Sequence, residues 1–161
     1  MPAPKAATLK EDGWEPIADF DAATISARVP GHFFEAGLRH IARRGWIAPD
    51  GQHTVVELLQ FPDHQAAYAL ETDLVAGPPQ AFGKPEKSTA TTTLTVPNLG
   101  DTTEDVTVQT FDSVEGHAGQ VARRAVFRTG DVVAIVTATG PEKVGTVALD
   151  QEIMLQAELL R

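Results

Sequence analysis

Residues 120–139 decide the fold, and they read QVARRAVFRTGDVVAIVTAT. Two runs rich in Val and Ala, residues 120–128 and 132–139, flank the segment Thr129-Gly130-Asp131. Apolar and β-branched residues favour strands, and a short segment containing Gly between two such runs favours a hairpin turn. This stretch therefore predicts an antiparallel β-hairpin in the C-terminal half of the chain.

The segments on either side of the hairpin extend this architecture. Upstream, residues 89–96 and 106–111 are rich in Thr and Val, which predicts two further strands, and residues 97–101 between them have turn chemistry. Downstream, Pro141 marks the start of a helix, because Pro is common at the first helical position. The apolar residues of that helix recur at helical spacing and predict one buried stripe, made of Leu149, Ile153, Ala157 and Leu160.

Helical patterns dominate the first half of the chain. A short helix is predicted over residues 21–29, with Asp21 as its N-cap and Pro30-Gly31 as its end. A second helix is predicted from His32 to Arg44, with an apolar stripe made of Phe34, Leu38, Ile41 and Ala42. Residues 54–61 (TVVELLQF) predict a mostly buried strand. After it, Asp63 is placed to cap a third helix, whose inner face is made of Ala66, Ala67, Leu70 and Leu74.

The predicted order α-α-β-α-β-β-β-β-α indicates an α+β fold. We expect an antiparallel sheet of about five strands with helices packed on it and a long C-terminal helix. Residues 1–13 mix Pro, Ala, Lys and acidic groups without periodicity, which predicts a flexible leader. Residues 14–161 are then a single domain.

Composition and charge exclude several classes of protein. The 161 residues are 42% hydrophobic and 22% charged, as expected for one globular domain. A net charge of -9 argues against nucleic acid or an anionic membrane surface as partner, because both attract cationic faces. The chain has no Cys, which excludes disulfides, thiolate nucleophiles and zinc–thiolate sites. Apolar stretches such as Val132 to Val136 are far shorter than the roughly 20 residues of a spanning helix.

The sequence shows no catalytic, cofactor-binding or metal-ligating constellation, so the balance is against an enzyme. The five His residues include no HExxH pattern and no pair spaced for a shared metal. Asp63 could orient His64, but its position before a helix favours capping. The acidic groups of a turn, Asp101, Glu104 and Asp105, could bind a hard cation, although a solvated hairpin loop explains them equally well.

A cationic cluster is the most unusual feature of this acidic chain. Arg39, His40, Arg43 and Arg44 come at the end of the second predicted helix, and Trp46 follows. Cations at a helix C-terminus suit the helix dipole, while Arg and Trp together are favoured at protein contacts and anion sites. We therefore regard these five residues as candidates for an interaction site. Three further cations, Arg123, Arg124 and Arg128, are predicted on a solvated sheet face or edge.

Three segments in order resemble small bacterial cell-envelope lipoprotein and sensor domains. Residues 55–67 (VVELLQFPDHQAA) are similar to the strand-then-helix element of those domains, residues 96–101 (VPNLGD) to their turn, and residues 125–136 to their hairpin. The resemblance implies an α/β/α sandwich of the Mog1/PsbP type, outside the cytoplasmic membrane, that binds a partner or ligand. The chain departs from the pattern in lacking a signal peptide and a lipobox Cys, and no functional residue carries over.

Three functions stay open. The leading one is a non-catalytic extracytoplasmic binding domain of an envelope protein, with a protein or small molecule as its partner. The second is a small cytoplasmic enzyme with an NTF2-like cone, in which His117 or Asp131 acts as a base inside an apolar cavity. The third is a structural subunit that forms a homodimer or larger oligomer. We expect an envelope location if an export signal precedes Leu9 in the full gene, and the cytoplasm otherwise.

Overall fold

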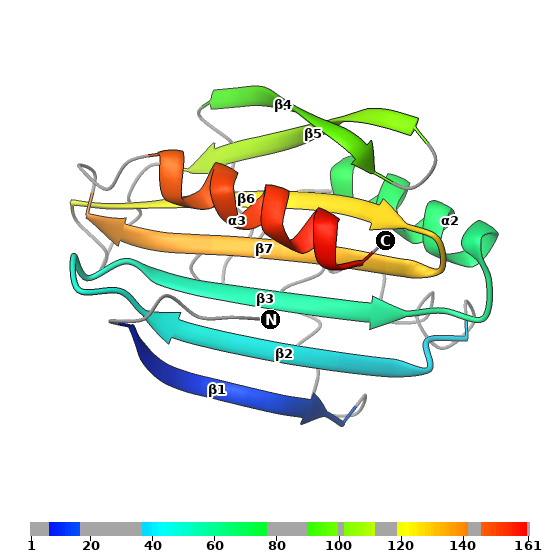
Figure 1. Ribbon diagram of the computed structural model, residues 1–161, viewed down its shortest axis with the longest axis horizontal. Helices are drawn as coiled ribbons and strands as arrows, with labels where there is room; N and C mark the ends of the chain where they lie inside the picture. Colours follow the sequence, from blue (N-terminus) through cyan, green and yellow to red (C-terminus); the bar gives the residue numbers. More distant parts are fainter. Residues whose placement is uncertain are drawn as a thin grey trace.

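Seven strands form one antiparallel sheet in the order β1-β2-β3-β7-β6-β5-β4 (Figure 1). The computed structural model describes residues 7–16, 37–76, 90–99, 102–111, 119–141 and 146–160. The strands and helices within these ranges are β1 (Thr8–Glu15), β2 (His40–Ile47), β3 (His53–Gln60), α2 (His64–Ala76), β4 (Ala90–Leu99), β5 (Thr102–Phe111), β6 (Gln120–Thr129), β7 (Val132–Pro141) and α3 (Thr146–Leu159).

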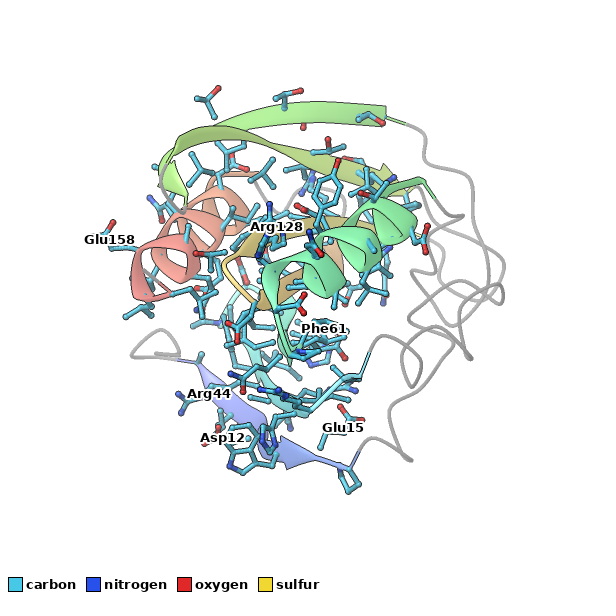
Figure 2. All side chains as sticks on the ribbon, turned by 90° about the vertical axis from the view of Figure 1, so that its right-hand side faces the viewer. Asp12, Glu15, Arg44, Phe61, Arg128 and Glu158 are labelled. Carbon is cyan, nitrogen blue, oxygen red and sulfur yellow. The ribbon has the colours of Figure 1, made fainter. Side chains whose placement is uncertain are left out.

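The two helices cover opposite faces of the sheet, as Figure 2 shows in a view along it. Successive strand residues point to opposite faces, so each strand contributes to two cores. On the face toward α2, called the α2 face, the buried cluster is Leu38, Ile41, Leu59, Phe61, Ala67, Leu70, Leu74, Val126, Val133 and Ile135. On the other side, called the α3 face, it includes Trp46, Val56, Val106, Val108, Phe127, Val136, Leu149 and Ile153.

The hairpin of residues 120–139 is confirmed as β6 and β7. The two strands pair from Gln120–Pro141 to Thr129–Val132, and Gly130 occupies the turn with a φ of 56°. That left-handed conformation costs Gly little and most other residues more. Asp131 also joins the turn to the end of β3, because its carbonyl accepts from the Phe61 amide at 2.9 Å and its Oδ2 from Gln60 Nε2 at 3.3 Å.

Three further local predictions are confirmed. Asp63 caps α2, since its Oδ1 accepts hydrogen bonds from the amides of Gln65 at 3.0 Å and Ala66 at 2.9 Å. The predicted strand at residues 54–61 is β3. Of the four residues predicted to form the inner stripe of the last helix, Leu149, Ile153 and Ala157 are buried against the α3 face, and Leu160 is partly buried there. These features depend on short stretches of sequence.

The predicted architecture is wrong in strand number and in the C-terminal helix. The sheet has seven strands instead of about five, and α3 has 14 residues, nearly the same as the 13 of α2, so it is not a long helix. Neither the five-stranded Mog1/PsbP-type sandwich nor the NTF2-like cone describes this sheet. The coarser description, an antiparallel sheet with helices packed against it, holds.

The helix predicted from His32 to Arg44 is also wrong where the structure describes it, because residues 40–47 are strand β2. Pairing with β1 on one side and β3 on the other satisfies the backbone along both edges of β2, and this tertiary pairing outweighs the weak helical pattern. Residues 8–13, predicted as part of the leader, lie in β1. The helix predicted over residues 21–29 lies outside the described residues.

Candidate functional site

A row of charged side chains crosses the α2 face. The first three members are Glu15 of β1, Arg43 of β2 and Glu57 of β3. Arg43 and Glu57 are directly paired, and Glu15 pairs with Ile41, two residues along β2 on the same face, so it lies diagonally from Arg43. The Nη1 atom of Arg43 is 3.3 Å from Oε1 of Glu57 and 3.5 Å from Oε1 of Glu15. Glu57 is only 2% exposed, so the negative end of this ion pair lies inside the protein, while Arg43 is partly exposed.

Arg124 of β6 is the fourth member of this charged row. It pairs with Thr137 of β7, which pairs with Val55 of β3, so Arg124 shares the α2 face with Glu57 across the intervening strand. Only 2% of Arg124 is exposed. Burial lowers the pKa of Arg124 to about 10, and the negative charge of Glu57 partly opposes that change.

The guanidinium of Arg124 is incompletely hydrogen-bonded. Its Nε and Nη2 atoms are both buried and have no hydrogen-bond partner within the described part of the chain. Most buried polar groups in proteins are paired, and an unpaired buried donor costs free energy. A buried, charged group with two unused donors is therefore the clearest candidate for a binding group on this face.

The residues around Arg124 on the α2 face are partly polar and partly apolar. Gln109 of β5 and Thr137 of β7 lie directly opposite it on either side. One residue pair farther from α2, Phe111 and Ala122 form a small apolar cluster that is fully buried. That next row continues through β7 to His53 of β3, whose Nε2 is also buried without a partner among the described residues.

The five sequence candidates do not form one patch. Strand alternation in β2 places Arg43 on the α2 face, in the charged row, and Arg44 on the α3 face, where its Nη2 is 3.4 Å from Oδ2 of Asp12. Figure 2 shows this separation, with Asp12 and Arg44 on the side of α3 and Glu15 on the side of α2.

The remaining three candidates have separate environments. Trp46 is buried in the core of the α3 face. His40 is exposed, and its ring lies 5.5 Å from the ring of Trp14 in an edge arrangement. Arg39 is exposed just before β2, and its amide donates to the Gln60 carbonyl at 2.8 Å. Of the five, only Arg43 lies in the charged row.

Sequence reasoning missed Arg124, which was predicted on a solvated sheet face or edge. That prediction is wrong for Arg124, because β6 is an interior strand between β5 and β7 and this side chain is buried. The one available indication is that Arg124 stands within the apolar run 121–127, which is typical of a strand covered on both faces. Glu57 stands in a similar apolar run, 55–59.

Other sequence candidates fall outside the charged row. Asp131, considered as a base, lies in the β6–β7 turn with the hydrogen bonds to β3 given for the fold. His117 and Asp101 are outside the described residues, as are the side chains of Glu104 and Asp105. Among the residues that the structure does describe, no group of three or more His, Asp or Glu could hold a metal ion.

A second buried polar pair lies on α3. Glu152 is 8% exposed, and its Oε1 accepts a hydrogen bond from Gln156 Nε2 at 2.6 Å. Burial raises the pKa of the Glu152 carboxyl, and the hydrogen bond from Gln156 opposes part of that rise. This pair lies between α3 and the sheet and is separate from the charged row.

Neither α2 nor α3 is long and apolar enough to cross a membrane.

Comparison with known proteins gives little. No family model matches the chain, and no curated protein matches it. Among solved structures, the extracellular domain of PknH from Mycobacterium tuberculosis is similar with a TM-score of 0.49 and 13% sequence identity. The match covers 95% of this chain and 81% of that one. A similarity of this size carries no inference about the function of the chain.

Proposed function

We propose that the chain is a non-catalytic binding domain of a bacterial envelope protein and that its ligand binds on the α2 face at the charged row. The location rests on the resemblance of residues 55–67, 96–101 and 125–136 to envelope lipoprotein and sensor domains. The binding role rests on the structure of the row itself.

The observation that carries the binding role is the burial of Arg124 with two unused donors. Placing a charged group inside a protein is costly, and pairing repays the cost only when the hydrogen bonds are complete. In the charged row Glu57 lies 3.3 Å from Arg43, but two donors of Arg124 have no partner among the residues that the structure describes. A ligand group that accepts those hydrogen bonds explains why the cost is tolerated.

The chemistry of Arg124 suits binding better than proton transfer. Its pKa of about 10 leaves the guanidinium protonated at neutral pH. General acid–base catalysis is most effective when the pKa of the group lies near the working pH. A cation that keeps its proton acts as a fixed donor, which orients and holds a ligand.

Backbone amide NMR spectra test the binding role without knowing the ligand. Mixtures of anionic, cationic and neutral metabolites are added to the folded protein, and shift changes are mapped on the assigned spectrum. We expect at least one mixture to move the amides of Val55, Arg124 and Thr137, while the exposed Tyr68 amide on α2 stays unchanged. Binding that maps only to other surfaces, or no binding by any class of compound, would refute the proposal.

An enzyme fusion tests the envelope location separately. The complete native gene product is fused at its C-terminus to alkaline phosphatase, which is active only outside the cytoplasm. We expect phosphatase activity in intact cells. Activity absent from the fusion, with a cytoplasmic reporter active in its place, would refute the location and leave the binding role standing.

A further inference from the structure

We infer that the α2 face holds a carboxylate-binding site in which Arg124 is the anchor and the ligand is a small organic monoanion with an apolar body. The inference rests on the proposed binding function and specifies its ligand class. It depends on three properties of Arg124: which of its nitrogens are unused, the charges beside it, and the residues opposite it in the sheet.

The unused nitrogens are the pair that binds a carboxylate side-on. Nε and Nη2 are neighbours on one side of the planar guanidinium, and their N–H bonds point in nearly the same direction. Two parallel donors of this kind match the two oxygens of a carboxylate or phosphate. Both atoms are buried without a hydrogen-bond partner among the residues that the structure describes. Arg124 therefore carries the donor pair that a bidentate anion would use.

The charges of the row favour a ligand with no more than one negative charge. Glu15 and Glu57 are balanced by Arg43 and Arg124, so the row is neutral as a set. A monoanion adds one negative charge beside Arg124, while a phosphate monoester dianion adds two near the carboxylate of Glu57. Because like charges repel strongly in a buried site, the carboxylate is the better fit.

The residues around Arg124 fit the rest of such a molecule. Phe111 and Ala122 form the next pair on the same face, two residues along β5 and β6, and make the neighbourhood of Arg124 apolar on that side. Gln109 and Thr137, directly opposite Arg124, provide a polar side chain on each side of the guanidinium. Sites for small ligands commonly combine an apolar lining with a few fixed polar groups.

The Nε–H resonance of Arg124 tests the inference directly. Spectra of arginine side chains are recorded while the wild-type protein is titrated with butyrate and benzoate, with butyramide and benzamide as uncharged controls of the same shape. We expect the carboxylates to shift the Arg124 Nε–H signal and slow its hydrogen exchange, and the amides to do neither. Methyl phosphate is the competing anion, and we expect it to bind at least tenfold more weakly than butyrate.

Conservative variants separate the effect of the two parallel donors of Arg124 from the effect of its positive charge. Arg124→Lys keeps the positive charge but has no parallel donors, so we expect at least a tenfold loss of benzoate affinity. The matched control is Arg128→Lys on the same strand and face, where Arg128 already pairs with Glu71 at 3.2 Å, and we expect no change in affinity. If Arg124→Lys fails to fold, the wild-type Nε–H titration still decides the question.

Four outcomes overturn the carboxylate site: an Arg124 signal unmoved by every carboxylate, equal binding of the amides, tighter binding of methyl phosphate, or unchanged affinity in Arg124→Lys. If backbone amides of the α2 face then still respond to uncharged compounds, the proposed binding function survives and only the ligand class is wrong. If no compound of any class moves those amides, both proposals are wrong.

Discussion

Replacing Arg124 by Met is expected to stabilise the protein in the absence of ligand. Met fills much of the same volume with an apolar side chain and removes the buried charge together with its two unpaired donors. The carboxylate of Glu57 keeps Arg43 at 3.3 Å, so it does not become an isolated buried charge. A side chain that lowers the stability of the ligand-free protein is what we expect at a binding site.

The magnitude follows from the groups that the substitution removes. Each unpaired buried donor costs about 1–3 kcal/mol, and exchange of buried charges for apolar groups of similar size stabilises proteins by about 1–4 kcal/mol where it has an effect. The lost attraction between Arg124 and Glu57 reduces the gain. We expect a net gain of about 2 kcal/mol, which raises the Tm of a domain of this size by roughly 4–8 °C.

Urea unfolding and a thermal scan of wild type and Arg124→Met measure this change. The control is Arg128→Met, which removes the ion pair with Glu71 and the contact with the Tyr68 ring, 5.6 Å from the guanidinium carbon. Because those interactions are satisfied and partly exposed, we expect the control to lose about 0.5–1 kcal/mol. If Arg124→Met is less stable than Arg128→Met, Arg124 is a structural partner of Glu57 and the reasoning about unused donors fails.

Three further substitutions test the fold around the site. Asp63→Ala removes the cap of α2 and is expected to cost about 1 kcal/mol in urea unfolding, with Asp73→Ala later in the helix close to neutral; equal losses would contradict the capping role. Glu57→Gln leaves the guanidinium groups beside it without their buried counter-charge and is expected to cost about 3–5 kcal/mol, clearly more than Glu15→Gln at the more exposed end of the row. Burial raises the pKa of Glu152, so the folded state binds the proton more tightly than the unfolded state. Protonated Glu152 therefore contributes to stability below pH 4.5, and this contribution is lost as the pH rises through the folded-state pKa. Glu152→Gln should abolish that loss, so the variant should be more stable than wild type at pH 7 but not at pH 4. Urea unfolding between these two pH values measures the difference. A wild type that gains stability relative to the variant as the pH rises would contradict the prediction.

The sequence predicted those elements that are specified by neighbouring residues. Gly130 between two apolar runs is enough to identify the β6–β7 hairpin, and Asp63 after Pro62 is enough to place the start of α2. In both cases the decisive contacts join residues close together in the chain. A short stretch of sequence is therefore enough to predict each of these two elements.

The sequence did not predict elements that depend on distant partners. The segment around Ile41 has apolar residues that fit either a helix stripe or one face of a strand, and only its pairing with β1 and β3 selects the strand. For the same reason, the sequence did not predict the candidate site at Arg124. Whether Arg124 lies in solvent or inside the protein is decided by β5 and β7 on its two sides, and its own strand indicates this only through the apolar run 121–127.

The pairing of β3 with β7 has a consequence for how the chain acquires its structure. Every other pair in the sheet joins strands that are consecutive among the described elements, but this one joins the first three strands to the last four, and its contact between Gln60 and Asp131 spans 71 residues. Contacts of such long sequence separation slow folding, because a large loop must close before they form. During synthesis from the N-terminus, β3 lacks its β7 partner until residues 132–141 have been made. An unpaired strand edge exposed for that time invites association between nascent chains, so we expect the yield of folded protein to depend on the rate of synthesis and on chaperones that shield this edge.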